Sequence, residues 1–133
     1  MSAAAAGAVD AVFVALADPT RRQLLELLGD RAAASATALA GQLPVTRQAV
    51  VKHLAILEGS ELVSRHRDGR EVVFTVRPER LVATASWMTS LAASWAERLQ
   101  LLKQVAEAGP VPAPGETRPA GETRPTGGTS PAG

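Results

Sequence analysis

The sequence predicts a mainly α-helical fold with a small β-hairpin wing, and three observations support this prediction. Hydrophobic residues make up 46% of the 133 residues and aromatic residues only 3%, which indicates an aliphatic core of Leu, Val and Ala. Apolar residues recur at helical spacing through most of the chain before residue 109. One Asp-Gly pair, Asp68–Gly69, stands between two β-rich runs and is a strong hairpin signal.

Composition divides the chain into three regions. Residues 109–133 contain six of the nine prolines and six of the eleven glycines, and they repeat GETRP at 115–119 and 121–125. Such a segment buries too little apolar surface to offset the entropy of ordering it, so we expect a disordered Pro/Gly-rich tail. A flexible N-terminus is expected over residues 1–9 and one folded domain over residues 10–108.

Two helices are predicted at the start of the folded domain. The first spans residues 10–17. Asp18 followed by Pro19 is a favourable helix start, because Asp accepts hydrogen bonds from free backbone N–H groups and Pro suits the first turn. The second helix is expected to end at Gly29, since glycine commonly follows the last helical turn.

Two shorter helices are predicted next, separated only by residues 43–45. Ser35 is the expected cap of a helix over residues 36–42, and Thr46 is the expected cap of a helix over residues 47–58. Two helices joined by so short a turn form a helix-turn-helix pattern.

The predicted hairpin follows directly, with a two-residue turn at Asp68–Gly69. Val63, Val72 and Phe74 then share one face, which should pack on the helices and leave an exposed, basic tip. The expected cross-strand pairs are Arg67–Arg70, Arg65–Val72 and Val63–Phe74, with His66 opposite Glu71.

The last helix is predicted from Pro78 to about Ala106. Its apolar and small residues follow steps of four and three, a heptad pattern by which one helix packs along another. At 1.5 Å per residue this helix is roughly 40 Å long. A domain of this size covers only part of such a helix, so the remaining apolar stripe is expected to meet another chain.

The helix-turn-helix with a hairpin behind it is a winged helix-turn-helix pattern, which favours double-stranded DNA as the partner. Val50, Leu54 and Leu57 should face the core, whereas the outer face of the same helix has no acidic residue before Glu58. The net charge is only +1, so DNA binding must come from this local clustering of positive charge.

The side chains expected to contact DNA match groups on a duplex. Arg47 suits guanine, Gln48 suits adenine and Val51 suits a thymine methyl group. Lys52 and hydroxyls near helix N-termini suit phosphates, and the hairpin arginines suit the minor groove or the backbone. The expected DNA-binding residues are Ser35, Thr37, Thr46, Arg47, Gln48, Val51, Lys52, Arg65, Arg67 and Arg70.

Other readings are weaker. A basic helix face alone, or a basic hairpin tip alone, is often only a solvated surface. The prediction of DNA binding depends on the two occurring together. The alternative is a winged-helix protein-interaction module without direct DNA function. An enzyme is not expected, because two histidines and no phosphate loop or nucleophile motif offer little chemistry. RNA binding is disfavoured because no aromatic platform is available for stacking bases.

Several signals are missing from the sequence. There is no cysteine, which excludes disulfides and thiolate metal sites. No Lys or Arg precedes Arg21, so a secretion signal is not expected, and no run of 18 apolar residues is present to span a membrane. We therefore expect a cytoplasmic protein that does not contact membranes.

The chain resembles the ArsR family of bacterial winged-helix repressors over about residues 10–108. The segment LADPTRRQLLELL (16–28) resembles the second-helix signature of that family, and VTRQAVVKHLAILEGSELVSRHRDGREVVFTV (45–76) resembles its recognition helix and wing. WMTSLAASWAERLQLL (87–102) is similar to a subgroup with a Trp-bearing C-terminal helix.

The resemblance implies a homodimeric transcriptional repressor that binds an inverted-repeat operator, joined through its first and last helices. An unidentified small-molecule or protein effector would control it. The residues then expected at the dimer contact are Val12, Phe13, Leu81, Met88, Leu91, Trp95, Leu99 and Leu102.

The chain also departs from the family pattern. The family often has Ser where Val51 stands, which puts one phosphate contact in doubt. Many members sense metals, but SATALAGQL (35–43) has no metal ligand and the last helix has no His, Cys or Asp, so no metal and no cofactor are expected.

One of Arg21 and Arg22 is expected in a structural ion pair, and Trp87 either flanks the dimer contact or lines a small pocket.

Overall fold

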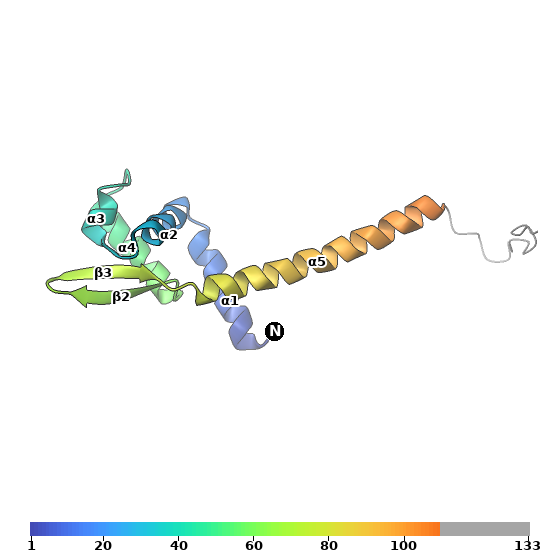
Figure 1. Ribbon diagram of the computed structural model, residues 1–133, viewed down its shortest axis with the longest axis horizontal. Helices are drawn as coiled ribbons and strands as arrows, with labels where there is room; N and C mark the ends of the chain where they lie inside the picture. Colours follow the sequence, from blue (N-terminus) through green and yellow to red (C-terminus); the bar gives the residue numbers. More distant parts are fainter. Residues whose placement is uncertain (110–133) are drawn as a thin grey trace, which may run out of the picture. The chain divides into compact units, whose positions relative to one another are not determined.

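The computed structural model describes residues 1–109, which form five helices and three strands (Figure 1). The disordered tail expected over residues 109–133 lies, apart from Gly109, outside the described residues. The elements are α1 (Ala3–Leu16), α2 (Pro19–Arg31), β1 (Ala34–Ser35), α3 (Ala36–Ala40), α4 (Arg47–Gly59), β2 (Val63–Asp68), β3 (Glu71–Val76) and α5 (Glu79–Ala108).

Helix α1 begins at Ala3, so the flexible N-terminus expected over residues 1–9 is wrong. The Ser2 side chain accepts a hydrogen bond from the backbone N–H of Ala5 at 3.1 Å and caps the helix. The alanines that follow have the highest helix propensity, so the helix starts well before the first apolar side chains of the core.

Helix α2 begins as predicted but runs beyond Gly29. The Asp18 carboxylate accepts hydrogen bonds from the N–H groups of Thr20 at 2.8 Å and Arg21 at 3.3 Å. The helix continues to Arg31 and ends where Ala32 adopts a φ of 69°. The predicted stop at Gly29 is therefore wrong, because glycine inside a helix lowers its stability without ending it.

The helix-turn-helix has the expected caps. Ser35 accepts from the N–H of Ala38 at 3.1 Å and starts α3, which ends at Ala40, two residues before the predicted end. Thr46 accepts from the N–H of Ala49 at 3.1 Å and starts α4. The core-facing positions predicted for α4 are confirmed: Val50, Leu54 and Leu57 are buried.

The sheet has three antiparallel strands in the order β1-β3-β2, and the short β1 was not predicted. The hairpin turn lies at Gly69–Arg70 rather than Asp68–Gly69, and Asp68 pairs with Glu71. Gly69 has a φ of 66°, and glycine at the first central position is typical of type II′ hairpin turns.

The predicted cross-strand pairs are therefore wrong, because the register is shifted by two residues. The shift keeps the side-chain alternation, so the predicted inner face of the hairpin still faces the helices. The observed pairs are Arg67–Val72, His66–Val73, Arg65–Phe74 and Val63–Val76.

The core is aliphatic, as the composition predicts, and Phe74 is the aromatic residue within it. Helices α2 and α3 contact β3 and helix α4 contacts β2, and each helix contributes buried apolar side chains to this core. The largest fully buried side chains are Leu24, Leu28, Leu39, Leu54, Leu57, Leu62, Val12, Val50 and Val63.

The described chain falls into two units, residues 1–92 and the segment from Ala93 onward. Helix α5 passes through this boundary. Thr84 is buried in its first part, whereas no side chain is buried in residues 93–108. The core thus lies within residues 1–92.

No single helix within residues 1–109 is long and apolar enough to cross a membrane. Only the pair α1 and α2 passes that test together, by length and composition, with a bend of 99° between the two helices.

Candidate nucleic-acid interface

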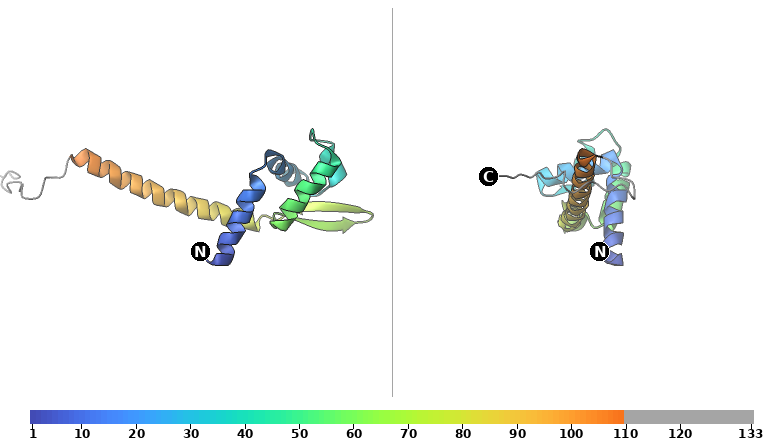
Figure 2. Two further views of the ribbon diagram at one scale, coloured as in Figure 1. Left: turned by 180° about the vertical axis from the view of Figure 1, so that it is seen from behind. Right: turned by 90° about the vertical axis from the view of Figure 1, so that its right-hand side faces the viewer.

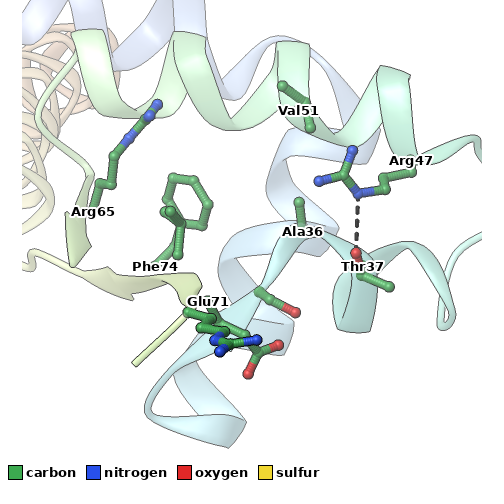
Figure 3. A pocket seen from close by; sticks show the side chains of 10 residues that line it. Ala36, Thr37, Arg47, Val51, Arg65, Glu71 and Phe74 are labelled. Atoms are coloured by element: carbon green, nitrogen blue, oxygen red, sulfur yellow. Dashed lines mark hydrogen bonds between the residues drawn. The ribbon is translucent and has the colours of Figure 1, made fainter. Parts of the chain in front are cut away.

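A cleft of about 390 Å³ lies between the helix-turn-helix and the wing (Figure 3). Its walls come from the start of α3, the outer face of α4 and the inner face of the hairpin. Six of the ten predicted DNA-binding residues line it: Ser35, Thr37, Arg47, Val51, Arg65 and Arg70. The fold therefore brings together residues that are up to 35 positions apart in the sequence.

Arg47 links the two helices of the helix-turn-helix. Its Nε donates a hydrogen bond to Thr37 Oγ1 at 3.0 Å (Figure 3). The bond uses Nε alone, and the two terminal nitrogens make no hydrogen bond to any residue in 1–109. The guanidinium is thus oriented by Thr37 while its bidentate edge stays available for a base or a phosphate.

Arg65 is held by the protein from two sides. Its Nη2 donates to Glu58 Oε1 at 2.9 Å, and its guanidinium carbon lies 5.5 Å from the centre of the Phe74 ring. The sequence did not reveal either contact. They tie the wing to the end of α4, so part of the role of Arg65 is to position the wing.

The remaining cationic side chains of the site are exposed. Lys52 lies on the outer face of α4, and Arg67 and Arg70 lie at the hairpin tip. None of the three forms an ion pair with a residue in 1–109. Gln48 and Val51 are also exposed, so the outer face of α4 combines hydrogen-bonding, apolar and positive groups.

Ser35 and Thr46 already use their oxygen lone pairs as helix caps. A hydroxyl that accepts a hydrogen bond still has its own proton to donate. Both residues can therefore cap a helix and donate to a phosphate oxygen at the same time, beside the free N–H groups of the helix N-terminus.

Glu71 places an acidic side chain at the cleft, and it was not among the predicted DNA-binding residues. It lines the cleft (Figure 3), as does the preceding residue, Arg70. Its expected partner His66 lies elsewhere, because the register shift pairs His66 with Val73. His66 Nε2 instead lies 3.0 Å from Thr75 Oγ1 and 3.3 Å from Ser64 Oγ.

Arg21 is a structural residue away from the cleft. Its Nε donates to the carbonyl of Ala15 at 2.6 Å and its Nη2 to that of Val14 at 3.1 Å, which satisfies the C-terminus of α1. Its Nη1 lies 3.3 Å from His53 Nδ1 and 3.9 Å from Asp18, which confirms the expected ion pair. This network fixes α4 against the end of α1.

The electrostatics of this network lower the pKa of Asp18. Desolvation is the largest single effect and raises the pKa of Asp18. The hydrogen bonds from the N–H groups of Arg21 and Thr20, together with the electrostatic effects of His53 and Arg21, lower the pKa by more.

The residues expected at a dimer contact fall into two groups. Val12 is completely buried in the core, so its assignment to a dimer contact is wrong, and Leu81 is half-buried against the same core. Phe13 packs edge-on against Trp87 with 5.7 Å between ring centres and stays 40% exposed. The other five are exposed: Met88, Leu91, Trp95, Leu99 and Leu102.

Within residues 1–109, no group of three or more His, Asp or Glu side chains is placed to hold a metal ion.

Comparison with known proteins identifies the family. A model described as a helix-turn-helix domain matches residues 16–66. The transcriptional repressor SdpR of Bacillus subtilis is 34% identical over 79 residues, which cover 58% of this chain and 84% of SdpR.

Two solved structures of regulators are also similar. An ArsR-like transcriptional regulator from Rhodococcus sp. RHA1 is 41% identical with a TM-score of 0.68, covering 75% of this chain and 93% of that one. Another ArsR family transcriptional regulator is 30% identical with a TM-score of 0.61, covering 68% and 92%. The chain belongs to the ArsR family of winged helix-turn-helix proteins and is a DNA-binding transcriptional regulator rather than an enzyme.

Proposed function

We propose that this chain is a homodimeric repressor that binds an inverted-repeat operator, with α4 in the major groove and the wing, residues 65–72, on the minor groove or backbone. The observation that carries the proposal is the cleft in which Arg47 of α4 and Arg70 of the wing line the same surface. The name of SdpR, a transcriptional repressor, supports repression as the direction of control.

The chemistry of α4 supports sequence reading in the major groove. Arg47, Gln48 and Val51 lie within the first five residues of the helix, the part that meets base edges in helix-turn-helix proteins. Lys52 follows on the same exposed side and suits the phosphate backbone.

The wing supports a second contact beside the first. Arg67 and Arg70 are exposed at its tip and unpaired within residues 1–109. Arginines enter narrow minor grooves or neutralise phosphates. The clamp of Arg65 on Phe74 and Glu58 holds this tip in a fixed position relative to α4.

The apolar stripe of α5 supports the homodimer. Met88 and Leu91 are exposed in the first part of the helix, and Trp95, Leu99 and Leu102 are 51–63% exposed in the second. Apolar side chains at heptad spacing are the pattern of helix–helix association. A two-fold dimer then presents two copies of α4 to half-sites about 10 bp apart or a multiple of that. We place this regulator in the cytoplasm, where the DNA lies.

DNase footprinting of the DNA upstream of this protein's own gene tests the operator model. We expect protection of two inverted half-sites separated by a whole number of helical turns. Protection of one isolated half-site by a protein that sediments as a dimer contradicts the two-fold model.

A further inference from the structure

A second, apolar pocket of about 410 Å³ lies between α1 and the first part of α5, entirely within residues 1–92. Helix α1 passes beside the start of α5 in Figure 1 and in both views of Figure 2. The α1 wall consists of small side chains, which leave the space open. The walls include Ala5, Ala8, Val9, Ala83, Thr84 and Trp87.

Thr84 is the unusual group in this wall. It is 3% exposed, and its hydroxyl makes no hydrogen bond to any residue in 1–109. Thr89, five residues later in the same helix, donates instead to the carbonyl of Ala85 at 2.9 Å. Buried hydroxyls are nearly always hydrogen-bonded, so a buried hydroxyl that lines an open pocket indicates a bound polar atom.

The remaining groups define the ligand further. Arg80 is the only charged side chain of the lining, and it donates to the backbone carbonyl of Ser60 at 3.2 Å and pairs with Glu61. Met1, which carries the charged α-amino group of the chain, also lines the pocket and is 68% exposed. The lining thus offers no free charged side chain as a counter-ion, and its buried part favours an uncharged ligand. The volume lies within the range of small-molecule pockets.

We propose that this pocket binds an uncharged, mainly apolar small molecule whose single hydrogen-bonding group meets the Thr84 hydroxyl. Met88 and Leu91, which belong to the exposed stripe, do not line the pocket.

Arg80 connects the pocket to the DNA-binding elements. Its two partners, Ser60 and Glu61, form the junction between α4 and β2. Ser60 caps the C-terminus of α4, and Glu61 holds a left-handed backbone with a φ of 59°, which a non-glycine residue adopts only under constraint. A ligand that displaces Arg80 releases this junction and weakens DNA binding. This regulatory half of the proposal rests on the proposed function, whereas the binding half does not.

Isothermal titration calorimetry of the full chain with 2-naphthol tests the binding half. 2-Naphthol is apolar, is uncharged at neutral pH and carries one hydroxyl. We expect one molecule bound per chain, about fivefold weaker binding in Thr84→Val because one hydrogen bond is lost, and no binding in Ala8→Leu, which fills the pocket. Ala96→Leu, outside the pocket, should bind as the wild type does. No binding by the folded wild type, or equal binding by Ala8→Leu, overturns the proposal.

Fluorescence anisotropy of labelled promoter DNA, with and without 2-naphthol, tests the regulatory half. We expect the ligand to weaken DNA binding by the wild type but not by Arg80→Met, which keeps the apolar stem and loses the hydrogen bonds. An equal response in both proteins overturns the role of Arg80. Arg80→Met should bind the DNA more weakly than the wild type before any ligand is added, because its junction is already released. Failure of the wild type to bind the DNA without 2-naphthol counts against the proposed function alone, because the calorimetry needs no DNA.

Discussion

The guanidinium carbon of Arg65 on β2 lies 5.5 Å from the ring centre of Phe74 on β3, directly across the hairpin. The same guanidinium pairs with Glu58 near the end of α4. One side chain therefore joins both strands of the wing to α4. This contact helps to fix the position of the wing relative to α4.

Arg65→Ala should loosen the wing. We expect a loss of about 1 kcal/mol in the free energy of unfolding, because both contacts are partly exposed. DNA affinity should fall as well. Urea denaturation and DNA titration check both effects, with Arg67→Ala as the control. Arg67→Ala should lower DNA affinity without changing the free energy of unfolding. Equal destabilisation by both substitutions contradicts a special role for Arg65.

Lys52→Ala should weaken DNA binding by a similar factor for every sequence, because a phosphate contact carries no sequence information. The slope of log K against log salt should become shallower by about 1. Lys103→Ala, on the second unit, is the charge-matched control and should leave the slope unchanged. A loss of DNA affinity that is confined to one operator sequence would show that Lys52 contacts bases.

Asp18 should make stability depend on pH in the acid range. Its pKa in the folded protein is lowered from 3.8, so the carboxylate stabilises the fold above that pH and loses the effect as the pH falls through the lower, folded value. Asp18→Asn keeps a capping side chain without the charge. Denaturation curves should show the wild type more stable at neutral pH and the two proteins converging below about pH 4. A constant difference at all pH values contradicts this account.

Leu99→Glu should disrupt the dimer, because it places a charge in the apolar stripe of α5. Sedimentation velocity should show a shift towards monomer, with unchanged helix content by circular dichroism. Gln100→Glu adds the same charge one position away, on another side of the helix, and should leave the dimer intact. A Leu99→Glu protein that stays fully dimeric places the interface elsewhere.

The sequence predicted most of the fold through local rules. Asp18, Ser35 and Thr46 are recognisable caps, and the burial of Val50, Leu54 and Leu57 follows from helical spacing alone. The hairpin register failed because Gly69 serves as the first turn residue rather than the second, a choice that the Asp-Gly signal does not determine. Side-chain alternation survived because a shift of two residues preserves it.

The contacts between distant segments could not be predicted from the sequence. Strand β1 has only two residues and exists because Ala34 and Ser35 pair with β3. Val12 has the spacing of either a core or an interface residue, and only the packing of α1 on α2 decides between the two. The Arg47–Thr37 hydrogen bond and the Arg65 clamp depend on tertiary geometry in the same way.

The most direct test of the central claim is the affinity of the full chain for the DNA upstream of its own gene, measured by fluorescence anisotropy at two salt concentrations with scrambled competitor. We predict specific binding that weakens as salt rises, and a loss of about tenfold to a hundredfold in Arg47→Ala, because a bidentate base contact disappears. Binding by a folded Arg47→Ala protein that matches the wild type in affinity and specificity would contradict the assignment of α4 as the element that reads the operator.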